Sequence, residues 1–173
     1  DNMRRHITAE ETRRLLERIR REVPGIHIRT TMMVGFPGED DAAFERLVDF
    51  VKEQRFERLG AFAYCEEDDT YAARNYDDSI PDEVKQARLE RLMSVQEEIA
   101  TEVAASKVGK TLRVIIDEYD DNMGRWIGRT EFDSPEVDCN VFVESDSELA
   151  PGDIRNVTIT DSEGFDLYGT VRL

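Results

Sequence analysis

The spacing of apolar residues predicts a helix near the start of the chain. Thr8 followed three residues later by Glu11 is typical of a capping box, in which each side chain accepts a hydrogen bond from the backbone amide of the other residue. Apolar residues then recur at helical spacing until Pro24 ends the helix. Its arginine pairs alternate with glutamates, which favours a solvated face with ion pairs four residues apart over a phosphate-binding track.

A strand, a glycine turn, a second helix and a second strand follow. Residues 26–34 alternate between two unlike faces, as in a strand with one polar side. A helix capped by Asp40 or Asp41 comes next, and residues 58–64 predict another strand. Helices that alternate with strands over short links are the signature of a parallel sheet. We therefore expect an α/β fold.

A polar stretch over 66–79 predicts a loop, and a long helix follows it. Pro81 suits the first helical position, and Gly109 ends the helix. The predicted apolar stripe of this helix consists of Val84, Leu92, Val95, Ile99 and Val103.

From Thr111 onward the chain changes to short apolar runs separated by Gly, Asp, Asn and Pro. The predicted strands cover 112–116, 125–130, 140–144, 154–160 and 167–173. Several short strands in so few residues suggest a small β-barrel of OB type. The sequence thus predicts two domains, 1–107 and 108–173.

Composition describes an ordinary globular protein, with 39% apolar and 36% charged residues. The net charge is -16, and residues 108–173 hold 6 basic against 15 acidic side chains. A surface that follows phosphates needs clustered Lys and Arg, so nucleic acid is an unfavourable partner for this part. A basic protein fits better, although an acidic surface that only maintains solubility remains open on charge alone.

Other signals in the chain are negative. No segment approaches the roughly 18 apolar residues of a membrane span, so we expect no membrane partner and a cytoplasmic location. Cys65 and Cys139 lie far apart and form no Cys-x-x-Cys pair, which predicts reduced thiols. His6 and His27 have no second ligand nearby in sequence. We expect no metal site.

The turn Gly35-Phe36-Pro37-Gly38-Glu39 is the best candidate for a site. It follows a predicted strand and precedes a helix, where parallel α/β folds bind ligands. It does not match the dinucleotide pattern, and no Gly-Lys-Ser/Thr follows as in a phosphate-binding loop. From the turn alone, a plain structural role remains open.

The residues around the turn resemble a known family. Arg29–Glu39 resembles the late barrel strand and loop of radical S-adenosylmethionine methylthiotransferases, and Phe62–Glu67 and Val108–Thr111 are similar to that family as well. Gly128–Thr130 and Asp166–Gly169 resemble a TRAM domain, the small β-barrel that follows the catalytic barrel in these enzymes. The match runs through nearly the whole chain.

The resemblance implies the C-terminal half of a radical-SAM (βα) barrel followed by a TRAM barrel, and therefore a fragment of a larger enzyme. It also implies S-adenosylmethionine and two 4Fe-4S clusters in the full-length protein. Two isolated cysteines cannot ligate two clusters, so we expect no catalytic residue, no bound cofactor and no activity in this chain alone. By resemblance, the cofactor-facing residues are Arg29, Thr31, Gly35, Phe36, Pro37 and Gly38. Tyr64 could stack on adenine or simply pack in the core.

Two branches of this family differ in substrate. One modifies a tRNA adenosine, and the other, RimO-like, methylthiolates an aspartate β-carbon in a small-subunit ribosomal protein. The run 133–138 resembles the tail signature of the RimO-like branch, and Arg29–Thr31 resembles its strand. Negative charge on the tail agrees, because it would steer a basic ribosomal protein and repel tRNA. We expect Asp133, Glu136 and Asp138 to dock this protein substrate.

Two alternatives remain at this stage, a tRNA adenosine methylthiotransferase and a non-catalytic acidic adaptor. Trp126 and Phe132 could form an aromatic RNA-binding surface, but acidic surroundings favour core packing for both. Half a barrel would also leave a sheet edge open, through which the fragment could self-associate.

Overall fold

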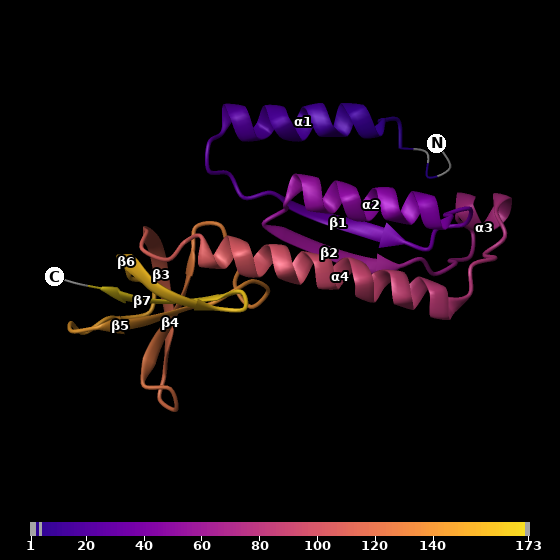
Figure 1. The fold of residues 1–173 in the computed structure, drawn as a ribbon. Coiled ribbons are helices and arrows are strands. Elements are labelled where there is room, and N and C mark those ends of the chain that lie inside the picture. Colours follow the sequence, from indigo (N-terminus) through magenta and orange to yellow (C-terminus); the bar gives the residue numbers. More distant parts are fainter. Residues whose placement is uncertain (1–2, 4, 172–173) are drawn as a thin grey trace. The chain divides into compact units, whose positions relative to one another are not determined.

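The computed structural model describes residues 3 and 5–171, which fold as two compact units (Figure 1). One unit contains the residues up to Ile99, and the other begins at Ala100. The division lies within helix α4 (Asp82–Ala105), because Ala104 near its end is buried in the core of the second unit. The predicted domain limit at 107/108 instead follows the end of this helix.

The first unit is built on two parallel strands. β1 (Arg29–Val34) and β2 (Arg58–Ala63) form a two-stranded sheet in which Thr31 lies opposite Gly60. The predicted strand over 26–34 thus begins only at Arg29. The two faces differ as predicted, because Thr31 is exposed while Val34 is buried.

Two helices of this unit begin at the predicted caps. α1 (Ala9–Glu22) has the full capping box, with the Glu11 amide donating to Thr8 Oγ1 at 3.2 Å and the Thr8 amide donating to Glu11 Oε2 at 2.8 Å. α2 (Asp41–Gln54) begins after Asp40, whose carboxylate accepts a hydrogen bond from the backbone at 2.7 Å. These contacts satisfy amides that a helix start would otherwise leave unpaired.

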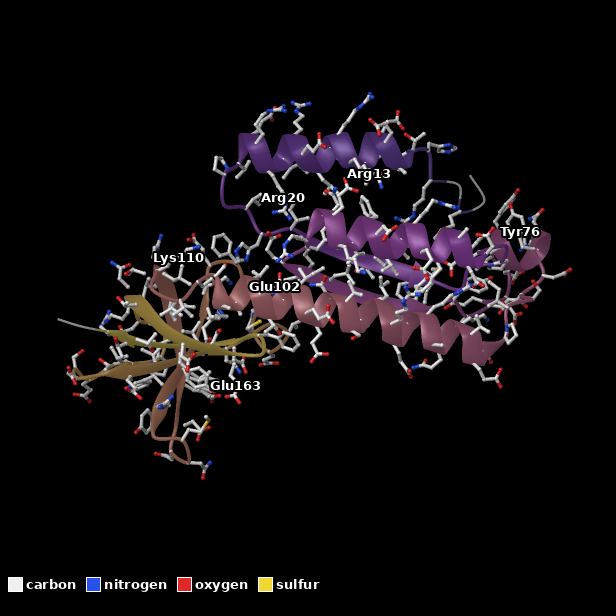
Figure 2. The ribbon with its side chains drawn as sticks, in the orientation of Figure 1. Arg13, Arg20, Tyr76, Glu102, Lys110 and Glu163 are labelled. Atoms are coloured by element: carbon white, nitrogen blue, oxygen red, sulfur yellow. The ribbon has the colours of Figure 1, made fainter. Side chains whose placement is uncertain are left out.

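Not all arginines of α1 lie on a solvated face. The pairs Arg14–Glu10 and Arg18–Glu22 have the predicted spacing of four residues. Arg20 instead reaches toward the rest of the unit (Figure 2), where its guanidinium donates to both carboxylate oxygens of Glu57 at 2.7 and 3.1 Å. The same carboxylate accepts from the backbone amide of Ile28 at 2.8 Å. This one buried carboxylate therefore anchors α1 beside the start of both strands.

Replacement of Glu57 by glutamine is expected to destabilise the first unit by about 2 kcal/mol at pH 7, because it breaks this bidentate pair. Burial alone would raise the pKa of Glu57, but the hydrogen bonds from Arg20 and Ile28 outweigh it and lower the pKa below the ordinary 4.5. The carboxylate's contribution is therefore complete above pH 4.5 and is lost as the pH falls through the lower, folded-state pKa.

Urea unfolding of the wild type and of Glu57→Gln between pH 7 and pH 3 tests this expectation. The difference in unfolding free energy should shrink only below about pH 4.5. Glu53→Gln removes the partly exposed pair between Arg13 of α1 and Glu53 of α2, and should cost less than about 1 kcal/mol at pH 7. An equal loss in both variants would show that burial of Glu57 is unimportant.

Two details of the region before and within α4 differ from the sequence prediction. The stretch 66–79, predicted as a loop, contains the short helix α3 (Tyr71–Asn75), because the Thr70 hydroxyl caps its first turn. Val84, predicted in the apolar stripe, is exposed. The buried face of α4 includes Lys85, Arg88, Leu92, Gln96 and Ile99. Three of these five are polar, so a search for apolar residues misplaces the face.

The second unit is a closed five-stranded β-barrel with the strand order β3-β4-β5-β7-β6. Its strands are β3 (Thr111–Asp120), β4 (Arg125–Thr130), β5 (Val141–Ser145), β6 (Ile154–Glu163) and β7 (Asp166–Val171). Each overlaps a predicted strand, although β3 and β6 continue beyond the predicted ends at 116 and 160. Residues 172–173 of the last predicted strand lie outside the described residues. All pairs are antiparallel except β5 with β7. Closure pairs every strand on both sides, which removes open edges.

Inward-facing residues of alternate strand positions fill the barrel, including Val114, Ile116, Val143, Val157 and Ile159. Gly169 is needed on β7 because a Cβ there would lie 2.5 Å from Val157 Cγ1. Trp126 packs partly against this core, as predicted. The same prediction for Phe132 is wrong, because this residue follows the end of β4 in a turn and is exposed.

Candidate functional site

The first unit has a cavity of about 450 Å³ at the carboxyl ends of its two strands. Residues from both strand ends and from the α3 region line it, among them Met33, Phe36, Phe62, Tyr64, Cys65 and Tyr71. The lining is mostly apolar. Parallel strands end at the same edge of a sheet, and α/β proteins bind small ligands at this edge.

Aromatic rings form much of the cavity wall. Phe36, after β1, lies edge-on to Tyr64, after β2, with ring centroids 5.2 Å apart, and to Tyr76 at 6.0 Å. Tyr64 is only 7% exposed, and its hydroxyl is buried without a hydrogen-bond partner among the described residues. Burial also raises the pKa of this phenol. A buried hydroxyl of this kind is available to a ligand or a water molecule.

The glycine turn holds Phe36 at the cavity. Gly35 has a φ of +76°, and the amide of Glu39 donates to the carbonyl of Phe36 at 2.9 Å, closing a turn in which Gly38 has a φ of +86°. The Gly35 amide donates to Glu39 Oε1 at 2.9 Å. The Gly35 amide is therefore paired within the turn. The part of the turn that lines the cavity is the Phe36 side chain.

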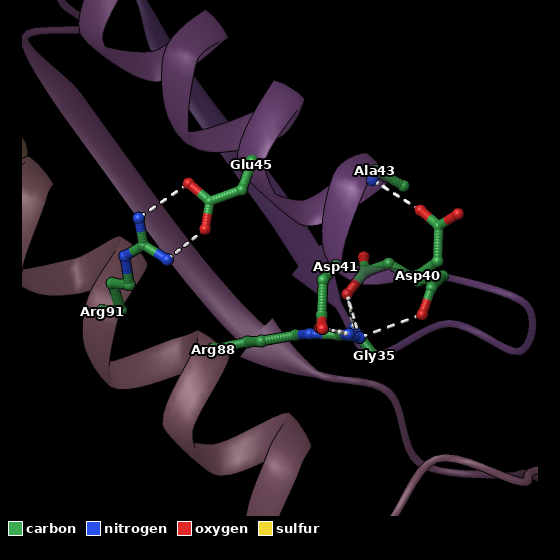
Figure 3. A network of polar contacts seen from close by, with 8 residues as sticks. Gly35, Asp40, Asp41, Ala43, Glu45, Arg88 and Arg91 are labelled. Carbon is green, nitrogen blue, oxygen red and sulfur yellow. Dashed lines mark hydrogen bonds and ion pairs between the residues drawn. The ribbon is translucent and has the colours of Figure 1, made fainter.

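Arg88 of α4 fixes this turn from the helix side (Figure 3). Its guanidinium donates to Glu39 Oε1 at 2.9 Å, to the Glu39 carbonyl at 3.1 Å and to Asp41 Oδ1 at 2.7 Å. The Glu39 carboxylate thus lies between Arg88 and the Gly35 amide. One turn further along α4, Arg91 pairs with Glu45 of α2 on the exposed side.

Lys85, one turn before Arg88, lies against both strand ends. A Cβ on Gly35 would be 2.5 Å from Lys85 Cγ, so the aliphatic part of Lys85 packs directly on the glycine. Its ammonium lies 5.6 Å from the centre of the Tyr64 ring and donates to Asp78 Oδ2 at 2.6 Å. Sequence analysis did not identify Lys85 or Arg88. Arg88 follows Lys85 by three residues and Leu92 follows it by seven, which places all three on one helical face. This spacing would have identified the two residues if polar side chains had been allowed in the buried stripe.

The six residues predicted to face a cofactor have different surroundings. Phe36 lines the cavity. Gly35 and Pro37 are buried beneath it, and Gly38 is exposed at the turn. Arg29 and Thr31 lie on the exposed face of β1, away from the helices that cover the other face. Contact between these residues and a cofactor stays a prediction.

The three predicted docking carboxylates are not equivalent either. Asp133 is buried and accepts a hydrogen bond from the Thr130 hydroxyl at 2.5 Å. Asp138 accepts from the Ser134 amide at 2.7 Å, which holds the same loop. Glu136, between them, is exposed and has a φ of +63°. Asp133 and Asp138 shape the loop, and Glu136 is the carboxylate that the loop presents to solvent.

Three further observations concern metal ligands, disulfides and membrane-spanning helices. Across residues 3 and 5–171, His, Cys, Asp and Glu side chains nowhere gather in threes as a metal ion would require. Cys65 and Cys139 are not joined in a disulfide. No helix in the part of the chain that the structure describes has the length and apolar content needed to cross a membrane.

Fold and cavity define a class of protein, an α/β unit with a cavity at its strand ends that is followed by a small β-barrel. The barrel matches the TRAM domain model over residues 108–171. The chain is 56% identical over 169 residues to the ribosomal protein uS12 methylthiotransferase RimO of Parabacteroides distasonis, covering 98% of this chain and 39% of that protein. Proteins of the same name from Bacteroides fragilis, with 98% and 39% covered, and Desulfitobacterium hafniense, with 98% and 38% covered, are 55% and 45% identical.

Over nearly its whole length the chain is similar to RimO methylthiotransferases. It spans about two fifths of the length of these relatives, 39% in the first of them. The family resemblance that the sequence motifs indicated is therefore confirmed, as is the TRAM domain.

Proposed function

We propose that the chain is part of an enzyme that adds a methylthio group to the β-carbon of an aspartate in a small-subunit ribosomal protein. The observation that carries the proposal is the identity of 45–56% over at least 98% of the chain to proteins named for this activity on uS12. Agreement over both units, and not only over the widespread TRAM fold, is what gives this observation weight.

The first unit is, in this proposal, the late part of a radical-SAM barrel. β1 and β2 are parallel, and each pairs with only one strand among the described residues. Their outer edges would pair with strands that belong to the remaining three fifths of the relatives' length. The exposed face with Arg29, Thr31 and Phe62 would then line the barrel interior. Without these strands the open edges favour self-association.

The cavity fits the adenosine part of S-adenosylmethionine. Its volume of about 450 Å³ suits such a group, its mostly apolar wall includes the aromatic rings of Phe36 and Tyr64, and the buried Tyr64 hydroxyl has no hydrogen-bond partner among the described residues. Phe36 and Tyr64 would hold the ring, and the apolar wall would exclude water from it. When bound, this cofactor supplies the radical chemistry of the reaction.

The chain does not fit the two iron-sulfur clusters. Such clusters are held by several cysteine thiolates, whereas Cys65 lies at the cavity and Cys139 lies in the other unit. We therefore assign the cluster ligands to parts of the protein outside this chain, and expect the chain alone to be inactive.

The TRAM barrel would recruit the substrate protein by charge. Residues 108–173 carry 15 acidic and 6 basic side chains, which favours a cationic polypeptide over tRNA. In the docking loop we retain Asp133, Glu136 and Asp138, with Glu136 as the contact residue and the two aspartates as the residues that shape it.

Replacing Glu136 by lysine is expected to weaken binding of the ribosomal protein by about fivefold, mainly through slower association at low salt. Titration of the intact protein with the purified ribosomal protein measures this change. Glu83→Lys makes the same change in net charge on an exposed position of α4 and should leave the affinity within about twofold. Equal losses for both variants would mean that only total charge matters, and no loss would remove Glu136 from the interface.

The function itself is tested in cells that contain or lack the intact gene. Mass spectrometry of the small-subunit ribosomal protein should find a methylthio group on one aspartate only when the gene is present. Analysis of tRNA nucleosides from the same cells tests the alternative substrate. A gene-dependent methylthio-adenosine would support the tRNA enzyme, and no change in either molecule would favour the adaptor.

A further inference from the structure

Lys85, which packs against the cavity residue Tyr64 and against Gly35, is unusual because it is charged and almost completely buried. It is 3% exposed, and a buried ammonium is costly unless it is paired. Asp78 supplies the main pairing at 2.6 Å, and Asp82 adds a longer contact at 3.3 Å. The hydrogen bond that Lys85 donates to the Asp78 carboxylate raises the pKa of Lys85, so the side chain is an ammonium at neutral pH.

The same side chain packs against a residue that follows each strand. Its Cγ, Cβ and Cδ fill the space beside Gly35, the residue between the end of β1 and Phe36. Its ammonium lies 5.6 Å from the ring centre of Tyr64, the residue that follows β2, within the range of a cation–π contact. Backbone hydrogen bonds of the sheet hold the chain at these positions, and the orientation of the Phe36 and Tyr64 rings depends on side-chain contacts.

We propose that Lys85 is a positioning residue that holds the Phe36 side and the Tyr64 side of the cavity in one fixed arrangement. The aliphatic stem limits movement of the Gly35 turn, and the ammonium fixes the Tyr64 ring against the Phe36 edge. A flat ligand then enters a cavity whose rings need no reordering, which increases affinity. This inference rests on the proposed function only for the identity of the ligand.

Hydrogen exchange in the intact protein tests the positioning role without any ligand. Two amides report on the two sides, since the Gly35 amide donates to Glu39 and the Tyr64 amide donates to the Val34 carbonyl at 2.8 Å. In Lys85→Met, which keeps the stem but removes the charge, exchange at Tyr64 should become about tenfold faster. Amides of α2 serve as the reference, because a general loss of stability would accelerate these as well.

Three further variants complete the test. Lys85→Arg keeps a cation and should restore exchange at Tyr64 to within about threefold of the wild type. Arg91→Met removes an exposed ion pair from the same helix and should change neither reporter. Asp78→Asn weakens the ammonium's anchor without touching the stem, and should accelerate exchange at Tyr64 but not at Gly35. It also keeps the proposal testable if Lys85→Met does not fold.

The second measurement compares the affinity of each variant for S-adenosylhomocysteine by calorimetry. Lys85→Met should bind this probe about tenfold more weakly than the wild type, with Lys85→Arg and Arg91→Met close to the wild type. Unchanged exchange at Tyr64 in Lys85→Met and Asp78→Asn, or an equal increase throughout α2, would overturn the positioning role. Failure of the wild type to bind the probe would instead contradict the proposed cofactor, while the exchange arm still decides the role of Lys85.

Discussion

Replacement of Gly35 by alanine is expected to lower the free energy of unfolding of the first unit by about 3 kcal/mol or more. Two costs add at this position. The φ of +76° is unfavourable by about 1–2 kcal/mol for any residue with a Cβ. The new methyl group would also lie 2.5 Å from Lys85 Cγ, and overpacking of this kind costs about 1–3 kcal/mol. Because Lys85 is held at both ends, it cannot easily move away.

Gly38→Ala is the matched control for this prediction. Gly38 has a φ of +86°, but nothing lies within 4 Å of the position that its Cβ would take. Only the backbone cost of about 1–2 kcal/mol should therefore appear. Urea unfolding followed by helical circular dichroism measures the first unit, which contains most helical residues, and Trp126 fluorescence separately reports on the barrel. Equal losses for the two variants would show that Lys85 does not pack tightly on Gly35.

Replacement of Arg88 by methionine is expected to cost about 3 kcal/mol. The Arg88 side chain is 9% exposed and that of Glu39 is 13% exposed, so the substitution leaves a largely buried carboxylate without its cation. Removing one partner of a buried pair typically costs about 3–5 kcal/mol, and methionine preserves some of the lost packing against Phe44. The loss should also loosen the turn, because Glu39 accepts the Gly35 amide.

Arg91→Met provides the comparison for Arg88 on the same helix. Its partner Glu45 and Arg91 itself are about half exposed, at 48% and 51% of their side-chain surface. Water screens such a pair, so the expected cost is below about 1 kcal/mol. The same urea experiment, read by circular dichroism, measures both variants. If Arg88→Met cost no more than Arg91→Met, Glu39 would have to find solvent or another donor when Arg88 is absent.

Periodic patterns of the sequence predicted the secondary structure well where side-chain polarity follows burial. The capping box at Thr8 and the cap at Asp40 lie where they were predicted, and each of the five barrel strands overlaps a predicted strand. The prediction failed for α4, where Val84 is exposed and Lys85 is buried. A buried cation is stable only when a carboxylate neutralises it, as Asp78 does for Lys85 and Glu39 for Arg88, and the periodicity of apolar residues contains no information about such partners.

Ring contacts and the burial of loop carboxylates also depend on the folded structure and are not visible in the local sequence pattern. The sequence identified the turn around Phe36 but not its contact with Tyr64, which is 28 positions away and meets it only because β1 and β2 are parallel neighbours. Asp133 and Glu136 look alike in sequence. In the structure Asp133 is buried and accepts a hydrogen bond from the Thr130 hydroxyl, whereas Glu136 is exposed. Burial, rather than residue type, therefore separates the shaping residues from the contact candidate.

By itself, the sequence determined the order of the longer helices and the strands, the acidic character of the barrel and the family resemblance, because these depend on local spacing, composition and motif identity. Tertiary structure alone decided which polar residues are buried and which side chains form the cavity. The physical reason is that Lys85 and Arg88 are stable in the interior only through contacts with Gly35, Glu39, Tyr64 and Asp78, which chain folding brings together.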